Sequence, residues 1–191
     1  MHMRSTFLHL LGIAAFLLAV QVTVLWLVGQ PFVCSCGVVK LWESSVWSIG
    51  NSQQLFDWYT FSHIGHGFIF YAAFWFLFPR MSVAYRLALS LGLEVSWELL
   101  ENTPWVIQAY RQQALAAGYN GDSILNSLSD SFSMTAGFLL AWRLPPRITL
   151  AIGLFMEVFT VYMVRDGLLL NLLNFIHQFD FISAWQNGAQ R

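Results

Sequence analysis

Long apolar runs separated by short polar segments make up almost the whole chain. A helix that spans a bilayer needs about 20 predominantly apolar residues, and five of the runs come close to that length. They predict membrane-spanning helices at about 7–28, 55–78, 83–107, 123–142 and 148–164. Pro, Gly and Arg residues lie between the runs, where helices are expected to end. The pattern therefore predicts a bundle of about five spanning helices.

The first and last apolar runs require separate interpretation. The run at 7–28 is longer than the roughly 15 apolar residues of a cleavable signal peptide, and no small-residue cleavage motif follows it, so we interpret it as a retained span. The last run, at 168–176, is too short to cross a bilayer. Its polar residues Asn171, Asn174 and Gln178 recur at helical spacing. This favours a helix at about 168–178 that lies in the membrane interface.

Composition agrees with a membrane protein. Of the 191 residues, 57% are hydrophobic and 10% are charged, whereas ordinary soluble domains carry about 25% charged residues. The net charge of -1 and the nine scattered basic residues give no basic patch for nucleic acid. The predicted fold class is an all-α membrane protein that forms a single domain, 1–191, in contact with the lipid bilayer. No second, water-soluble domain and no nucleic-acid partner are expected.

The Lys and Arg positions predict the orientation in a bacterial inner membrane, because positively charged short loops stay in the cytoplasm. With five spans, one side would hold Arg4, Arg80, Arg86, Arg143 and Arg147, and the other Lys40, Arg111, Arg165 and Arg191. The larger set shares its side with the N-terminus. The N-terminus is therefore predicted to be cytoplasmic and the C-terminus periplasmic. An even number of spans would require 168–176 to cross, which its length argues against.

Ionisable residues inside the predicted spans mark the candidate site, since each costs roughly 3 kcal/mol at mid-bilayer unless it has a partner or water. The helical rise of about 1.5 Å per residue places four of them in one layer about 11–15 Å below the outer face: His66, Glu98, Asp130 and Glu157. A shallower layer holds His63, Glu101, Asn102 and Asn126, with Asp122 at its mouth. Helical spacing also puts Glu94, Glu98 and Glu101 on one face. We therefore expect one polar cluster that is accessible from the periplasm.

Two imidazoles among several carboxylates suit a divalent metal such as zinc. The candidate ligands are His63, His66, Glu98 and Glu101. In the metal-free alternative, a carboxylate of raised pKa acts as a general acid or base with a histidine partner. In both cases the candidate catalytic residues are His66, Glu98 and Asp130. Supporting polar roles are assigned to Glu94, Asn102, Asp122, Asn126, Glu157, Arg165 and Asp166.

Several of these positions also have a structural interpretation. Asp122 stands where the fourth span begins and suits a helix N-cap as well as a ligand role. Glu157 has the alternative of pairing with one of the histidines. Pro104 predicts a kink in the last turns of the third span. Cys34 and Cys36 fall in the outer loop after the first span, where the open outcomes are a disulfide, metal ligation or free thiols.

Five segments carry a resemblance to a known family. They are CSCGVVKLWE, NSQQLFDWYTFSHIGHGFIFY, WELLENTPWVIQAYR, YNGDSILNSLSDSFSMTAGFLLAWRLP and FMEVFTVYMVRDGLLLNLL. The chain resembles, from about Val22 to Trp185, an uncharacterised proteobacterial inner-membrane family, the domain of unknown function 2585. The motif residues that it shares are Cys34, Cys36, His63, His66, Glu98, Glu101, Asn102, Asp122, Asn126, Asp130, Arg165 and Asp166. Gly167 departs from the Asn that is frequent in the family.

The resemblance implies a multi-pass protein of the cell membrane and implies no reaction. A fainter resemblance to VanZ-like membrane proteins rests on the order His, Glu, then Asp with Asn. Two function classes follow from the residues. One is a membrane-embedded hydrolase or transferase, with or without a metal, that acts on a lipid or lipid-linked substrate from the periplasmic side. The other is a non-enzymatic carrier or accessory subunit whose polar cluster locks the helices together; the sequence names no protein partner.

Overall fold

The computed structural model describes residues 2–188, with only the backbone described for residues 2–7. This part of the chain is helical, with no strand beyond one isolated β-bridge between Trp42 and Phe56, which confirms the predicted all-α class. The helices are α1 (His2–Leu27), α2 (Thr60–Leu77), α3 (Val83–Glu101), α4 (Pro104–Arg111), α5 (Ile124–Arg143), α6 (Pro146–Val164), α7 (Leu168–Ile176) and α8 (Asp180–Asn187).

The helix of the second predicted span, α2, begins five residues later than expected. Apolar residues occur from residue 55 onward, but the Asp57 side chain accepts the backbone N–H groups of Ser52, at 2.8 Å, and Tyr59, at 2.9 Å. Such side-chain bonds offer the backbone an alternative to the helix. Residues 55–59 therefore belong to the loop, and α2 begins at Thr60.

The prediction of a kink at Pro104 is wrong, because α3 ends before it. The Asn102 side chain donates to the carbonyl of Glu98 at 2.9 Å, and the Thr103 hydroxyl accepts the N–H of Val106 as the N-cap of α4. Pro104 is the first residue of α4, a position where its missing N–H costs no hydrogen bond. The third span as predicted, 83–107, is thus two helices joined by a turn. The helix α8 was not predicted.

The centre of the bundle is the close crossing of α2 and α5. A Cβ atom on Gly67 would lie 2.2 Å from the carbonyl oxygen of Met134, and one on Gly137 would lie 2.2 Å from that of Ile64. The two helices can therefore approach this closely only because both positions are glycine. Helix α5 also packs against α1 and α3. An apolar core formed by Leu91, Val95, Met134 and Phe138 lies between α3 and α5.

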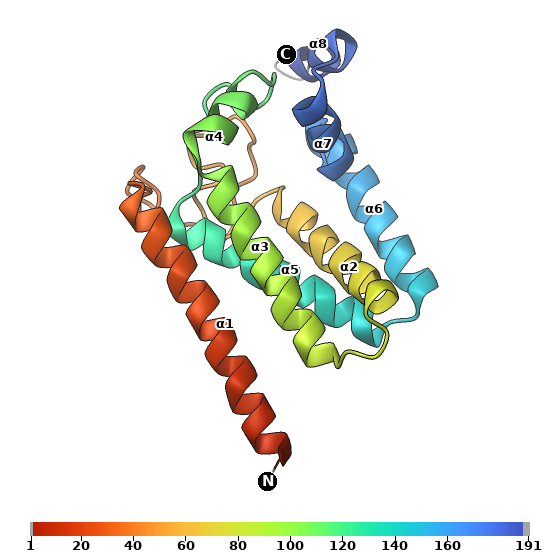
Figure 1. Ribbon diagram of the computed structural model, residues 1–191. Helices are drawn as coiled ribbons and strands as arrows, with labels where there is room; N and C mark the ends of the chain where they lie inside the picture. Colours follow the sequence, from red (N-terminus) through yellow and green to blue (C-terminus); the bar gives the residue numbers. More distant parts are fainter. Residues whose placement is uncertain (1, 189–191) are drawn as a thin grey trace.

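Connecting segments gather at two opposite ends of the bundle (Figure 1). The α2–α3 and α5–α6 connections lie toward the end where α1 begins, whereas the 28–59 loop, α4, α7 and α8 lie toward the other end. The loop is held to the start of α5, because the N–H groups of Ser123, Ile124 and Leu125 donate to its carbonyls. A disulfide joins Cys34 and Cys36 in this loop, which is the first of the outcomes left open by the sequence.

Two helical segments of the described chain are long and apolar enough to cross a membrane by length and composition. They are Leu8–Leu27 of α1 and the whole of α6, Pro146–Val164, and most residues of both are exposed. Helices α2, α3 and α5 have 18, 19 and 20 residues, which is a comparable length. They differ by carrying buried His, Glu, Asp and Ser side chains, which lower their mean hydropathy. The apolar helices point to membrane association.

Candidate functional site

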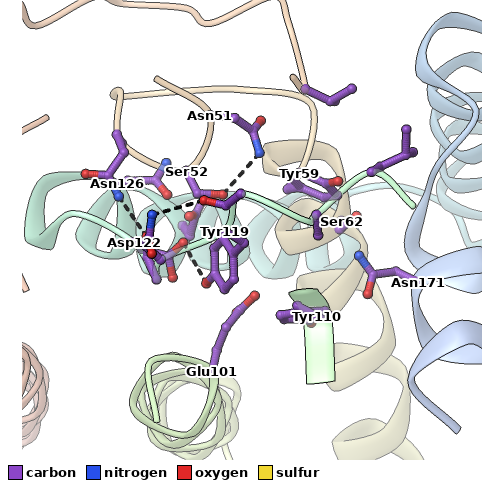
Figure 2. A pocket seen from close by; sticks show the side chains of 18 of the residues that line it. Asn51, Ser52, Tyr59, Ser62, Glu101, Tyr110, Tyr119, Asp122, Asn126 and Asn171 are labelled. Atoms are coloured by element: carbon purple, nitrogen blue, oxygen red, sulfur yellow. Dashed lines mark hydrogen bonds between the residues drawn. The ribbon is translucent and has the colours of Figure 1, made fainter. Parts of the chain in front are cut away.

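A cavity of about 1070 Å³ lies at the end of the bundle where the loop, α4 and α7 gather. Its wall is formed by α2, the end of α3, the start of α5, α7 and the segments around residues 46–53 and 115–122. Asn171 points into it from α7, opposite Ser62 of α2 and Tyr59, the residue before α2 (Figure 2). The wall includes four of the predicted catalytic or metal-binding residues, His63, His66, Glu101 and Asp130, and two of the predicted supporting residues, Asp122 and Asn126.

The inner end of the cavity is a cluster of two histidines and three carboxylates, which we call the His–carboxylate cluster: His63, His66, Glu94, Glu98 and Asp130. Nδ1 of His63 lies 2.6 Å from Oε1 of Glu94, and Nδ1 of His66 lies 3.1 Å from Oε2 of the same carboxylate. One glutamate of α3 thus binds two histidines that are one helical turn apart on α2. Glu94, to which the sequence assigned a supporting role, is at the centre of the cluster.

Glu98 and Asp130 contact the same imidazole of His63 from two other directions. Oε1 of Glu98 is 3.4 Å from Nδ1 of His63, and Oδ2 of Asp130 is 3.8 Å from Nε2. Both carboxylates are buried, with 0% and 4% exposure, yet Oε1 of Glu98 and Oδ1 of Asp130 have no hydrogen-bond partner. Buried polar atoms are normally paired. The cluster therefore has unused acceptor capacity beside the cavity.

The shallower residues form a separate hydrogen-bonded group around Asp122. Its Oδ2 accepts from the Asn102 side chain at 2.8 Å and its Oδ1 from the Tyr119 hydroxyl at 3.1 Å, as Figure 2 shows for Tyr119. Burial raises the pKa of Asp122 to about 7, although the bonds from Asn102 and Tyr119 oppose this shift. Ser123 rather than Asp122 is the N-cap of α5, since its hydroxyl accepts the N–H of Asn126. Glu101 lies near this group and turns toward Tyr119 (Figure 2).

Three predicted site residues, Glu157, Arg165 and Asp166, lie outside both the His–carboxylate cluster and the group around Asp122. Glu157 accepts the N–H groups of Leu168 and Leu169 at 3.0 and 2.9 Å, so it stabilises the first turn of α7 instead of joining the deep layer. Arg165 donates to the carbonyl of Trp185 and lies over its ring. Asp166 accepts from the Tyr59 hydroxyl at 2.9 Å. Burial raises the pKa of Asp166 to about 6 against the opposing bonds from Gly167 and Tyr59.

The four predicted metal ligands do not form a single set. Two groups of donor atoms lie close enough together to hold an ion among the described residues: His63, His66 and Glu94, and His63, Glu98 and Glu101. His63 belongs to both groups. The structure thus separates the predicted set into two and adds Glu94 to the one with both histidines.

Sequence reasoning also missed polar residues that are not ionisable. Gln21 of α1 is fully buried and donates to the Ser127 hydroxyl at 2.7 Å and to its carbonyl at 3.0 Å, while it accepts from the Ser131 hydroxyl at 3.0 Å. A lone amide in an otherwise apolar run was the signal that could have found it. Tyr59 and Trp97, which line the cavity, had no such signal, because aromatic residues occur throughout the predicted spans.

Comparison with known proteins confirms the resemblance seen in the sequence. A family model described as protein of unknown function (DUF2585) matches residues 25–188. A UPF0314 protein of Agrobacterium fabrum is 47% identical over 185 residues, which cover 97% of this chain and 93% of that protein. A UPF0314 protein of Sphingopyxis alaskensis is 45% identical over 177 residues, covering 93% and 94%. No solved structure matches. The chain therefore belongs to the DUF2585 family, and it is similar to UPF0314 proteins along almost its whole length.

Proposed function

We propose that the protein crosses the inner membrane five times and is a hydrolase or transferase that acts on a lipid-type substrate in the cavity. The single observation that carries this proposal is the His–carboxylate cluster at the inner end of a cavity of about 1070 Å³. Intramembrane ionisable residues are costly and usually serve function. Here they meet a space large enough for a substrate group.

The five spans are supported by the direction of the polar side chains. The His, Glu and Asp residues of the cluster on α2, α3 and α5 are turned toward one another, whereas large apolar residues lie at outward positions of the same helices. Examples are Phe76 of α2, Leu93 of α3 and Phe132 of α5, with 77%, 48% and 59% exposure. A helix of this kind presents an apolar face to lipid despite a lower mean hydropathy. We therefore treat α1, α2, α3, α5 and α6 as the spans.

The orientation is supported by the two ends of the bundle. The α2–α3 connection carries Arg80, and the α5–α6 connection follows Arg143 and precedes Arg147. Both connections lie toward the end where α1 begins (Figure 1), which the positive-inside rule assigns to the cytoplasm. Arg191 lies outside the described residues, and only the backbone of Arg4 is described. The cavity then opens toward the periplasm.

Reporter fusions test this topology. Fusions at Gly50 and Ala116 should report periplasm, and fusions at Arg80 and Arg143 should report cytoplasm. The cavity wall includes Ala116, so a cytoplasmic signal there would place the site on the opposite face and overturn the proposal of periplasmic access.

The substrate class follows from the two kinds of wall. Leu168, Leu169 and Leu172 of α7 and Ile69 of α2 form an apolar side, and the histidines and carboxylates form the polar end. Among the described residues, no Lys or Arg lines the cavity. An anionic group would meet carboxylates and no Lys or Arg here, unless a bound cation offset the negative charge. The walls fit an amphiphile whose apolar chain lies along α7 and whose uncharged or cationic polar group lies near Asp130.

Asp130 is placed to act as a general base. It lines the cavity, and its Oδ1 has no partner, so it can accept the proton of a water molecule or an acceptor hydroxyl. The oxygen would then attack the electrophilic centre of the substrate, and the proton would pass to the departing group. His63 and His66 are fixed in orientation by Glu94, which is a positioning role.

The alternative function is that of a carrier or accessory subunit with a structural polar cluster. One observation favours it: Gln21, Ser127 and Ser131 do lock α1 to α5 through buried hydrogen bonds. Those bonds lie apart from the cavity wall, so they do not account for the His–carboxylate cluster. The cavity is the reason to prefer the enzyme.

Complementation of a deletion strain tests the enzyme proposal. We expect His66→Ala, Glu98→Gln and Asp130→Asn each to abolish complementation while the protein still accumulates in the membrane. His177→Ala and Asp180→Asn are the matched controls, since both side chains are exposed on the C-terminal segment and should complement fully. Glu43 is unsuitable as a control, because it is buried and pairs with Lys40 at 2.9 Å. Full complementation by all three cluster variants would overturn the proposal that the protein is an enzyme.

A further inference from the structure

We propose that His63, His66 and Glu94 bind one divalent cation, with zinc as the best fit, at the inner end of the cavity. The role of this ion rests on the proposed function, whereas its binding does not. The three residues come from two helices: the histidines are at positions i and i+3 of α2, and the glutamate faces them from α3. The ion would supply the positive charge that the buried carboxylates lack.

The donor atoms lie close enough together for one ion to contact all three residues. Zinc binds imidazole nitrogen and carboxylate oxygen at about 2.0–2.2 Å, so neighbouring ligand atoms lie about 3.3 Å apart. Nδ1 of His63 lies 2.6 Å from Oε1 of Glu94 and Nδ1 of His66 lies 3.1 Å from Oε2, and one donor atom from each of the three residues lies within 4.8 Å of the other two. Two histidines and one glutamate are also a ligand set of catalytic zinc sites, which keep a fourth position for water or substrate.

Burial places that fourth position on the cavity side. Glu94 is fully buried behind the histidines, whereas His63 and His66 both line the cavity. An ion among the three would therefore be accessible only from the cavity. This is where the proposed function requires the substrate's polar group to lie.

Charge gives the second, independent reason. Glu94, Glu98 and Asp130 are three buried carboxylates, and none has an ion pair with Lys or Arg in the described chain. Buried charges are normally paired or coordinate a metal. The partnerless oxygens of Glu98 and Asp130 mark the side on which positive charge is missing. Asp130 also lies 3.8 Å from Nε2 of His63, where an outer carboxylate orients a metal-bound imidazole.

The second group of donors, His63 with Glu98 and Glu101, makes a different prediction. A set rich in carboxylate suits magnesium or manganese, whereas a set with two imidazoles suits zinc. The two sets share only His63. Variants of Glu94 and Glu101 therefore distinguish them.

The test is metal binding by the full chain, purified in detergent with its affinity tag removed. Mass spectrometry should find about one zinc per chain, the stoichiometry of a single site with three protein ligands. After chelation, titration with Co²⁺ should produce the visible absorption of a tetrahedral site. We expect His66→Ala and Glu94→Gln to weaken Zn²⁺ binding by more than about tenfold, the loss expected even for an outer-shell partner. His177→Ala, Asp180→Asn and Glu101→Gln should bind as the wild type does.

Each outcome decides one proposal separately. A wild-type chain that binds neither Zn²⁺ nor Co²⁺ overturns the ion, and so does a monodisperse Glu94→Gln variant that binds as the wild type does. Loss of binding in Glu101→Gln with retention in Glu94→Gln overturns this ligand set. If no metal binds while the cluster variants still abolish complementation, the ion is wrong and the enzyme stands. If metal binds but all cluster variants complement, the ion stands and the enzyme is wrong.

Discussion

Two polar groups in the interior of the bundle differ in residue type and in how completely their polar atoms are hydrogen-bonded. In the first, which we call the α1–α5 network, Gln21, Ser127 and Ser131 bond to one another at 2.7–3.0 Å. In the His–carboxylate cluster, Glu98 and Asp130 each retain a carboxylate oxygen without a partner. Hydrogen bonds of a structural role need no spare capacity. Spare capacity beside a cavity is what a binding site requires.

Glu98 belongs to both regions. Its Oε2 accepts from the Ser127 hydroxyl at 2.7 Å, and its Oε1 lies 3.4 Å from His63 without a hydrogen bond. One side chain thus connects the helix-locking bonds to the site. Variants that affect only one of the two regions are therefore needed to separate stability from function.

The largest loss of stability is expected at the α2–α5 crossing, a contact on which both regions depend. In Gly67→Ala the new Cβ would lie 2.2 Å from the carbonyl oxygen of Met134 and 2.4 Å from the nitrogen of Phe138. A backbone atom cannot move aside by itself. We therefore expect the free energy of unfolding to fall by an amount at or above the upper end of the roughly 1–3 kcal/mol seen for overpacking. Gly92→Ala is the control, since nothing lies within 4 Å of its Cβ. Thermal unfolding in detergent measures the stability of both variants. Equal stability of the two variants would contradict the close approach of α2 and α5.

A smaller effect is expected from breaking the α1–α5 network alone. Gln21→Leu leaves the hydroxyls of Ser127 and Ser131 without that partner in a buried environment, at a cost of about 1–3 kcal/mol. The melting temperature should fall, while Zn²⁺ affinity should stay at the wild-type value. Thr23→Val is the comparison, because its hydroxyl bonds to the Ala19 carbonyl of the same helix. Lost metal binding in Gln21→Leu would show that the two regions are not separable.

The shallow group around Asp122 predicts a pH dependence. Burial raises the pKa of Asp122 from 3.8 to about 7, so the folded chain holds a proton that the unfolded chain releases near pH 3.8. Its contribution to stability is therefore complete below about pH 4 and is lost as the pH rises through about 7. The ionisable groups facing it are Asp57, Glu101 and Tyr119.

In Asp122→Asn the slope of melting temperature against pH between about 4 and 7 should be smaller than in the wild type. The slope is compared rather than the absolute stability, because the new amide also changes the bond to Asn102. Asp57 and Asp166, which have raised pKa values of their own, provide the part of the slope that should persist. An unchanged slope would contradict the burial of Asp122 as its cause.

The smallest effect concerns the loop over the cavity. Because the structure joins Cys34 to Cys36, neither thiol should react with a labelling reagent in membranes without reductant, and both should react after reduction. Cys34→Ser with Cys36→Ser should change stability little, since the bond closes a very short ring, for which the loop-entropy gain is least. Ready labelling of both thiols without reductant would contradict the bridge or the periplasmic assignment.

Helical periodicity predicted much of this architecture because it depends only on local geometry. The i, i+3, i+4 rule placed Glu94 and Glu98 on one face of α3, and the structure brings both to His63. Boundaries were missed where a side chain competes with the helix, as Asp57 does before α2. Pro104 was misread because proline fits both a kink and a first turn.

Depth in a span also proved insufficient to place a residue. Glu157 was assigned to the deep layer from its distance to the helix end, yet it turns toward α7 and binds two N–H groups there. The depth of a residue in a span does not specify the direction in which its side chain points around the helix axis. The predicted layer also took no account of α7 as a possible partner. The partners of Glu94 could likewise not be predicted, because its central position depends on how α2 and α3 face each other.

The central claim is that the His–carboxylate cluster serves function and not stability, and Asp130→Asn tests it most directly. The substitution keeps the shape and replaces a buried carboxyl group that has a partnerless oxygen, whose burial is costly. We predict a melting temperature equal to or above that of the wild type, together with lost complementation, as is usual where a site is strained for function. A melting temperature that falls as it does in Gln21→Leu, with complementation intact, would contradict it.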